Sequence, residues 1–340
     1  MTAPLIGEGI PRAATLRSYW EPSQSLAMSR MKRAIGRQWW LALVIAMLIG
    51  GAGVGYDLWG GASPISALLF WSPIAIAAGL AAGFISELSR NTVTSLSSLG
   101  KQRGYSVLGA APELTPRSLR QLPPDQRNPL GCLAFQPASS YSTAFRDLQS
   151  TLSDKGVVAF ISAMSEDGAT TAALSTAVSA TQQGRNVIVV DCDLRRRSLT
   201  RRFDGRPENG VLEAAADPTT WRSLVVTEDE TGLQILPAAR IRNPWRSSLI
   251  GSRGFAELIG QLRQHYDQVI LDCPPALASS EGAVIASMAD ASVVVAAWDK
   301  TPLTAVRRTM QMLKRRMGGS AGIYVNRVPP GYRFGRLRPD

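Results

Sequence analysis

From residue 157 onward, short apolar runs alternate with segments whose apolar residues recur at helical spacing. The apolar runs occupy 157–161, 187–190, 233–236, 269–271, 292–298 and 321–325. Segments with helical spacing occupy 142–152, 169–183, 255–262 and 305–317. Strands that are apolar on both faces and joined by helices form parallel sheets that are covered on both sides. The pattern therefore predicts an α/β fold with a doubly wound, mostly parallel sheet.

Two longer apolar segments come before this alternating region. Residues 39–56 and 65–86 each approach the ~20 residues that a membrane-spanning helix needs. Asp57 is the one charged residue in this region, which makes a buried soluble hairpin the less favoured alternative. Lys and Arg flank the outer ends and are absent from the turn, which indicates cytoplasmic termini. We therefore predict that a two-helix transmembrane hairpin over 37–88 precedes the α/β domain.

Glycines at four-residue spacing lie in both apolar segments, at Gly51 and Gly55 and at Gly79 and Gly83. Such spacing lets two helices approach closely. Glycine is also common in membrane helices generally, so both interpretations stay open.

The rest of the chain divides by composition. Residues 1–36 are polar and basic and are interpreted as a cytoplasmic arm. Residues 89–140 include five prolines between 116 and 137, which is typical of a juxtamembrane segment followed by an extended linker. The α/β domain is assigned to 141–328, and a basic tail to 329–340.

Charge and rare residues narrow the possible partners. The chain carries 37 Lys and Arg against 26 Asp and Glu, a net charge of +11. This surplus favours an anionic partner, and anionic inner-leaflet lipid fits better than nucleic acid, because the basic residues are not interleaved with stacking aromatics. Three cysteines indicate a reduced compartment, and a single histidine, His265, excludes a multi-histidine metal site.

The loop between the first strand and its helix has the form of a phosphate-binding site. A P-loop-type fold places Gly-Lys-Ser/Thr at this position, with backbone amides facing the phosphates. Here the loop ends Gly168-Ala169-Thr170-Thr171, so alanine stands where the lysine belongs. Ala163 stands at an earlier glycine position, and Glu166 and Asp167 add negative charge.

Three carboxylates follow apolar strands: Asp191, Asp193 and Asp272. The carboxyl ends of parallel strands share one edge, where ligands of such folds bind. A carboxylate there commonly holds Mg²⁺ against nucleotide phosphates, and Thr170 would be a direct Mg²⁺ ligand in an intact P-loop. The predicted metal ligands, if the site is retained, are thus Thr170, Asp191, Asp193 and Asp272, and the three carboxylates are also the catalytic candidates.

These motifs resemble the cytoplasmic domain of bacterial tyrosine autokinases of the polysaccharide co-polymerase family, a group of deviant-Walker P-loop ATPases. Residues 188–195 (IVVDCDLR) fit the Walker A′ signature, and 269–275 (VILDCPP) fit the Walker B strand. Asn243-Pro244, residues 74–83 and the SVLGAAP segment also have the family form. The resemblance implies nucleotide contacts from Gly168, Thr170, Thr171 and Asn326.

The departures from the family pattern concern its chemistry. Ala169 replaces the lysine, Glu166 replaces a loop glycine, and only Arg146 survives from a helical oligomerisation motif. One tyrosine, Tyr332, stands in the tail where the family has a cluster, and a short turn replaces the family's large extracytoplasmic domain. These changes favour a pseudokinase that has no cofactor or binds Mg-ATP weakly.

The resemblance leaves three hypotheses. The preferred one is a scaffold or regulator in exopolysaccharide or capsule biosynthesis and export, in the bacterial inner membrane. Polysaccharide synthesis and export proteins would be its partners, in a homo- or hetero-oligomer. The alternatives are an active autokinase rescued by Arg195, Lys155 or Lys300, and a membrane-tethered nucleotide sensor. Because carboxylates at close range repel one another, we also expect Arg195, Arg196 or Arg197 to fold back as a counter-ion.

Overall fold

The computed structural model describes residues 26–61, 63–88, 92–94, 105–202, 207–228, 231–238, 249–316 and 320–329. They belong to two compact units, a smaller one within residues 21–91 and a larger one that continues from Thr92. The predicted features at 1–24, at Asn243-Pro244 and at Tyr332 lie outside the described residues.

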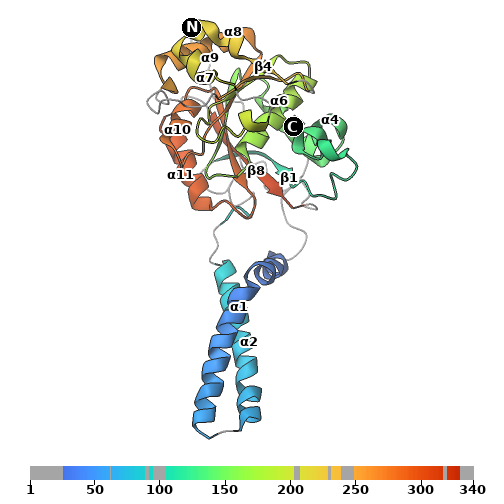
Figure 1. Ribbon diagram of the computed structural model, residues 1–340, viewed down its shortest axis with the longest axis vertical. Coiled ribbons are helices and arrows are strands. Elements are labelled where there is room, and N and C mark those ends of the chain that lie inside the picture. The colour runs from blue at the N-terminus through green and yellow to red at the C-terminus, as the bar shows by residue number, and fades with distance from the viewer. Residues whose placement is uncertain are drawn as a thin grey trace, which may run out of the picture. The chain divides into compact units, whose positions relative to one another are not determined.

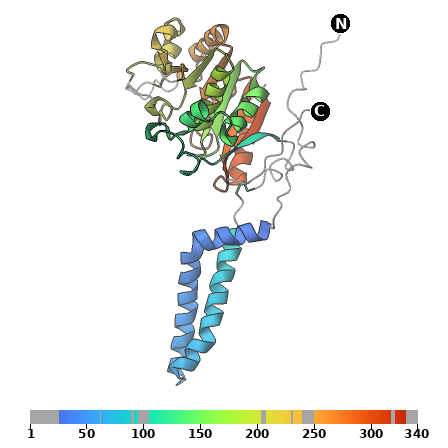
Figure 2. The same cartoon turned by 90° about the vertical axis from the view of Figure 1, so that its right-hand side faces the viewer.

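The smaller unit is a helical hairpin, drawn in blue in Figure 1 and Figure 2. Helix α1 (Leu26–Trp59) and helix α2 (Pro64–Leu88) contain the two segments predicted to be helical. Pro64 begins α2. At this position its fixed φ suits the helix, and its missing N–H removes no hydrogen bond within the helix. No helix among the described residues has both the length and the apolar character required to cross a bilayer.

The two helices pack through Gly53 and not through Gly51 or Gly55. A Cβ atom on Gly53 would lie 2.1 Å from the Trp71 ring, whereas one on Gly51 or Gly55 would meet nothing within 4 Å. Trp71 also donates from its indole nitrogen to the Asp57 carboxylate at 2.9 Å. Asp57 therefore has a hydrogen-bond partner inside the hairpin.

The larger unit is built on one eight-stranded sheet with the order β1-β8-β7-β2-β6-β3-β5-β4. The strands are β1 (Ser106–Pro112), β2 (Val157–Ser162), β3 (Val187–Asp191), β4 (Val226–Thr227), β5 (Gln234–Leu236), β6 (Gln268–Asp272), β7 (Ala291–Ala297) and β8 (Ser320–Val328). All neighbours are parallel except β4 and β5. The predicted doubly wound α/β fold is confirmed.

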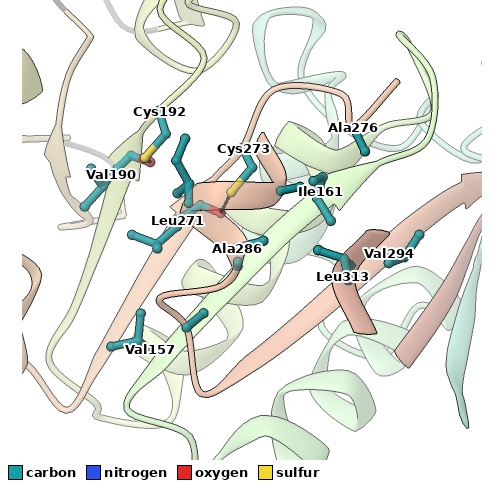
Figure 3. Close-up of a cluster of buried hydrophobic side chains, with 14 of the residues drawn as sticks. Val157, Ile161, Val190, Cys192, Leu271, Cys273, Ala276, Ala286, Val294 and Leu313 are labelled. Atoms are coloured by element: carbon teal, nitrogen blue, oxygen red, sulfur yellow. Dashed lines mark hydrogen bonds between the residues drawn. The ribbon is translucent and has the colours of Figure 1, made fainter. Parts of the chain in front are cut away.

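Helices cover both faces of this sheet, as Figure 1 shows. They are α4 (Pro129–Phe135), α5 (Ser140–Leu152), α6 (Ala169–Gln182), α7 (Val211–Ala216), α8 (Trp221–Leu224), α9 (Arg253–His265), α10 (Ser280–Ala286) and α11 (Leu303–Lys314), with 3₁₀ turns η2 (Pro124–Gln126), η3 (Thr200–Arg202) and η4 (Pro218–Thr220). Successive residues of β2 alternate between two apolar clusters: Val157 and Ile161 join one, and Val158 and Phe160 join the other. In Figure 3 the first cluster gathers side chains of the central strands with Ala286 of α10 and Leu313 of α11.

The segment predicted as a linker contains structure. Its SVLGAAP sequence forms edge strand β1, which pairs in parallel with β8. Leu108 of β1 packs so closely on Gly322 that a Cβ there would lie 2.5 Å from the leucine side chain. The absence of a side chain at Gly322 of β8 therefore allows the close pairing of the two strands.

We expect the hairpin to depend on Gly53 and to be indifferent to Gly55. Gly53→Leu would drive a side chain into Trp71, and overpacking of this kind commonly costs about 1–3 kcal/mol. The packing can be followed by cross-linking cysteines introduced as Gly50→Cys and Ala75→Cys, because a Cβ on Gly50 lies 3.3 Å from that of Ala75. Gly53→Leu should lower the cross-linking yield and the control Gly55→Leu should not. Equal yields in the two variants would contradict this packing.

Candidate functional site

The sheet brings the predicted site residues to one edge. Strand β2 ends at Ser162, the loop 163–168 follows, and α6 begins at Ala169. Strands β3 and β6 are paired so that Asp191 lies opposite Asp272, and the Cys192 amide donates to the Asp272 carbonyl at 3.0 Å. The loop, the first turn of α6 and the three carboxylates therefore share the carboxyl edge of the sheet.

Two residues of the loop have left-handed backbone. Gly168 has φ of 99°, and a Cβ there would lie 2.1 Å from the Asn326 amide nitrogen, so only glycine fits. Glu166, at a family glycine position, has φ of 67°, which costs a non-glycine residue about 1–2 kcal/mol. An ion pair at 2.9 Å between its carboxylate and Lys300 holds it, and this cation lowers the pKa of Glu166.

Asp167 is folded into the loop instead of adding charge beside the site. Its carboxylate accepts hydrogen bonds from the Met164 amide at 3.0 Å and the Thr301 hydroxyl at 2.7 Å. Its carbonyl accepts one from the Asn326 side chain at 3.2 Å. Burial raises the pKa of Asp167, and the bonds from Thr301 and Met164 oppose that rise. An internal carboxylate thus occupies one of the loop amides that a P-loop offers to phosphate.

Asn326, which the resemblance identifies as a nucleotide contact, is hydrogen-bonded to the backbone of the loop. Its amide nitrogen bonds the Asp167 carbonyl, and its amide oxygen accepts from the Arg327 backbone at 2.9 Å. The side chain is buried in this position. Contact with a nucleotide base stays a prediction, and the role visible here is structural.

The position of the missing lysine is apolar. Ala169 is 8% exposed and belongs to the cluster that packs α6 on the sheet. Lys300 is engaged with Glu166, and Lys155 pairs with Asp154 at 2.8 Å before β2, at the opposite edge of the sheet. Arg195 is exposed at the turn after β3. Lys300 is therefore engaged by the loop's own carboxylate, and within the described residues no ion pair or hydrogen bond joins Lys155 or Arg195 to the loop.

Asp191 is fully satisfied within the protein. One carboxylate oxygen accepts from the hydroxyl and the amide of Thr200 at 2.6 and 2.9 Å, and the other accepts from the Asp193 amide at 3.1 Å. Burial raises the pKa of Asp191 to about 6, while the bonds from Thr200 and Asp193 oppose the rise. Asp193 in turn accepts from the Arg196 amide at 3.1 Å. Both carboxylates order the turn that follows β3.

Asp272 differs from the other two carboxylates. It is fully buried, and no described residue donates a hydrogen bond to either of its carboxylate oxygens. Burial raises its pKa well above the ordinary value, the charge of Asp191 raises it further, and Thr170 and Arg202 lower it. A buried carboxylate is normally paired or coordinates a metal ion. Asp272 beside Thr170 therefore fits one side of a Mg²⁺ site.

The protein side chains alone do not complete such a site. Within the described residues, no group of three or more His, Cys, Asp or Glu side chains is placed to hold a metal ion. Mg²⁺ in nucleotide sites is usually held by one or two protein ligands, with water and phosphate oxygens completing the octahedron. Asp272 and Thr170 are the residues that would hold it, and the ion would supply charge to the phosphates.

The prediction that Arg195, Arg196 or Arg197 is the counter-ion of the three carboxylates is wrong. Among the described residues, no ion pair joins Arg195, Arg196 or Arg197 to the three carboxylates. The basic side chain beside the site is Arg202, whose guanidinium donates to the Thr171 hydroxyl at 2.9 Å. Neither Arg202 nor Thr200 is marked by the sequence, because both belong to a basic and polar run in which several residues look equivalent.

Fold and site together define a P-loop ATPase-type domain. Residues 157–316 match the AAA domain family. The chain is 26% identical over 179 residues to the succinoglycan biosynthesis transport protein ExoP of Rhizobium meliloti (strain 1021), covering 50% of this chain and 23% of that protein. It is 29% identical over 172 residues to the tyrosine-protein kinase YwqD of Bacillus subtilis (strain 168), covering 49% and 72%.

Solved structures agree with these relatives. The kinase domain of the Escherichia coli tyrosine kinase ETK aligns with a TM-score of 0.59 at 24% identity, covering 69% of this chain and 95% of that one. The VpsO kinase domain aligns with a TM-score of 0.50 at 26% identity, covering 59% and 96%. The α/β unit is thus similar to the bacterial tyrosine-protein kinase domains, as the sequence motifs predicted. The chain spans about a quarter of the length of ExoP.

The Asp167 contacts generate a test of the loop. Thr301 is fully buried, donates to Asp167 and accepts from the Ala297 amide at 2.8 Å. Thr301→Val should destabilise the full chain in urea by about 1–3 kcal/mol at neutral pH, because two buried groups lose a partner. Thr304→Val, at an exposed position in the first turn of helix α11, is the control.

The destabilisation caused by Thr301→Val should depend on pH. Because the pKa of Asp167 is raised on folding, its contribution to stability is most favourable at low pH and falls as pH rises through the folded pKa. Removal of the Thr301 donor raises that pKa further. The cost of Thr301→Val should therefore be larger at neutral pH than near roughly pH 3, which lies below the ordinary pKa of an aspartate and further below the raised pKa of Asp167. A cost independent of pH would contradict the bond between Thr301 and an ionised Asp167.

Proposed function

We propose that this protein is a membrane-anchored, catalytically degenerate relative of the tyrosine autokinases, which serves as a scaffold or regulator in exopolysaccharide or capsule biosynthesis and export. The observation that carries the proposal is the loop at the end of β2. It has a buried alanine at the lysine position and its own carboxylate on a loop amide.

The energetic argument concerns phosphoryl transfer. The lysine forms charge-assisted hydrogen bonds to the phosphates, each worth about 1.5–3 kcal/mol. Its loss costs more in the transition state, since phosphoryl transfer depends on positioning and electrostatic stabilisation. Mg-ATP binding is therefore weakened and transfer is weakened more. An active kinase would need a replacement cation directed at the transferred phosphate.

The polysaccharide role rests on the relatives. ExoP is described as a succinoglycan biosynthesis transport protein, and YwqD as a tyrosine-protein kinase. A chain that keeps the domain and loses the phosphate-binding lysine retains the means to contact such a system. Its partners would be polysaccharide synthesis and export proteins of the membrane, in a homo- or hetero-oligomer.

The membrane anchor is supported by the surface of the hairpin. Large apolar side chains are exposed along both helices: Leu43, Val44, Met47, Leu48, Tyr56, Leu58, Trp59, Ile65, Leu68, Leu69, Phe70, Ile74 and Ile76. An exposed apolar surface of this extent indicates contact with another apolar phase or partner. The sequence also has Arg30, Lys32 and Arg33 ahead of the apolar part of the hairpin, and basic residues at such a position favour anionic inner-leaflet lipid.

The anchor predicts a topology that reporter fusions can measure. Fusions after Gly36, at Gly61 and after Arg103 should report cytoplasmic, external and cytoplasmic locations, because Lys and Arg flank the hairpin and are absent from its turn. A cytoplasmic reading at Gly61 would exclude the transmembrane hairpin.

Catalytic degeneracy predicts the absence of autophosphorylation. The purified full chain incubated with radiolabelled Mg-ATP should show no phosphotyrosine, and Tyr332→Phe should leave polysaccharide production unchanged. YwqD, assayed in parallel, is the positive control for the kinase assay. Phosphotyrosine mapped by mass spectrometry to the tail of this chain would instead favour the active-kinase alternative.

A further inference from the structure

Arg202 contacts the first turn of helix α6 at Thr171, two residues after the alanine that stands at the lysine position. Its guanidinium donates to the Thr171 hydroxyl, and its charge acts on the buried Asp272. A guanidinium has five N–H donors, and one of them is used in the described contacts of Arg202. The remaining donors form the planar fork that binds phosphate oxygens well.

The 3₁₀ turn η3 fixes the place from which Arg202 reaches the helix. Thr200, two residues earlier, donates to Asp191 and accepts from the Ala238 amide at 2.9 Å. The Arg202 amide itself bonds the Leu199 carbonyl at 3.0 Å. The backbone that carries the guanidinium is thus anchored to a buried strand end, which reduces the entropy lost when a ligand binds.

Two further observations at this position point to a ligand. Helix α6 has 14 residues, and no side chain caps its N-terminus, so its dipole and free amides favour an anion. Asp272 faces Thr170 of the same turn, is fully buried, and has both carboxylate oxygens unpartnered. An anion at Arg202 and a carboxylate at Asp272 are brought together most simply by a divalent cation between them.

We propose that Arg202 replaces the missing lysine as the phosphate-binding cation, so that the site binds the phosphate chain of a Mg²⁺-bound nucleoside di- or triphosphate without transferring it. The proposal deepens the proposed function, on which it rests for the absence of transfer. It assigns the cation to a different element from the loop, η3, and it gives the unpaired Asp272 a partner.

Other cations at this edge are excluded by their contacts. Arg202 is exposed like Arg195 and Arg196, but among the described residues it alone of these three bonds the first turn of α6, whereas Lys300 is paired with Glu166. Arg201 precedes Arg202 in the same turn and is also exposed. Replacement of Arg201 therefore removes the same charge from the same turn and leaves the Thr171 contact intact.

The test is isothermal titration calorimetry on the full chain in detergent, with Mg-ADP, Mg-ATP and Mg-tripolyphosphate as ligands. We expect saturable binding to the wild type by all three, because the phosphate chain is the group recognised. Arg202→Gln should weaken binding about ten- to a hundredfold, the loss expected for one charge-assisted hydrogen bond. Arg201→Gln should change it less than about twofold, as expected for an exposed charge.

The outcomes distinguish the phosphate-binding role of Arg202 from the proposed function as a catalytically degenerate scaffold. Absence of binding to the wild type at millimolar Mg-ATP, or an equal loss in the Arg201 and Arg202 variants, would overturn the role of Arg202 and leave the scaffold intact. Phosphotyrosine formation would overturn the degenerate kinase and leave the Arg202 site intact. Thermal unfolding without ligand, equal for the two variants, establishes that a loss in Arg202→Gln arises at the site.

Discussion

Negative charge withdrawn from water is the constraint around which this domain is arranged. Asp167, Asp191 and Asp272 are all buried at one edge of the sheet, and burial raises the pKa of each. The cost of a buried carboxylate is met by hydrogen bonds or by a cation. Asp167 fixes the loop through Thr301, and Asp191 fixes η3 through Thr200. Among the described residues, none donates a hydrogen bond to the Asp272 carboxylate, which is therefore the carboxylate of this edge that is left to bind a cation.

The turn at residues 299–302, which bonds the loop, also bonds residues 92 and 93. Val93 donates to the Thr301 carbonyl at 3.0 Å and accepts from the Asp299 amide at 2.7 Å, and Thr92 bridges Pro302. Thr301 is the donor to Asp167, and its neighbour Lys300 pairs with Glu166. The segment 92–94 and the phosphate loop thus both contact residues 299–302.

The central fold could be predicted from the sequence because strands buried on both faces leave continuous apolar runs. Edge strand β1 was not predicted as a strand and fell within the segment assigned to juxtamembrane and linker residues, because its stability comes from backbone pairing and from Leu108 packing on Gly322. Such contacts join residues more than 200 positions apart, and local composition does not encode them.

The candidate site was predictable where it depends on topology alone. Residues that end parallel strands meet at one edge, so Asp191 and Asp272 were placed correctly beside the loop. The direction in which a short turn folds back is set by individual hydrogen bonds. The bond of Thr200 to Asp191 selects Arg202, rather than Arg195 to Arg197, for the side facing α6. Similarly, Asp167 was expected to repel an anion, and its bonds to Met164 and Thr301 turn it inward.

A cation on η3 has different consequences from a lysine in the loop. A P-loop lysine follows the phosphates that react and stabilises the charge that develops on them. Arg202 is held at Thr171 by a turn anchored to Asp191, so its charge acts on whatever phosphate rests on the first turn of α6. Such a contact stabilises the ground state and the transition state alike, which improves binding and leaves the chemical step unassisted. A chain that replaces its loop lysine in this way separates nucleotide recognition from phosphoryl transfer.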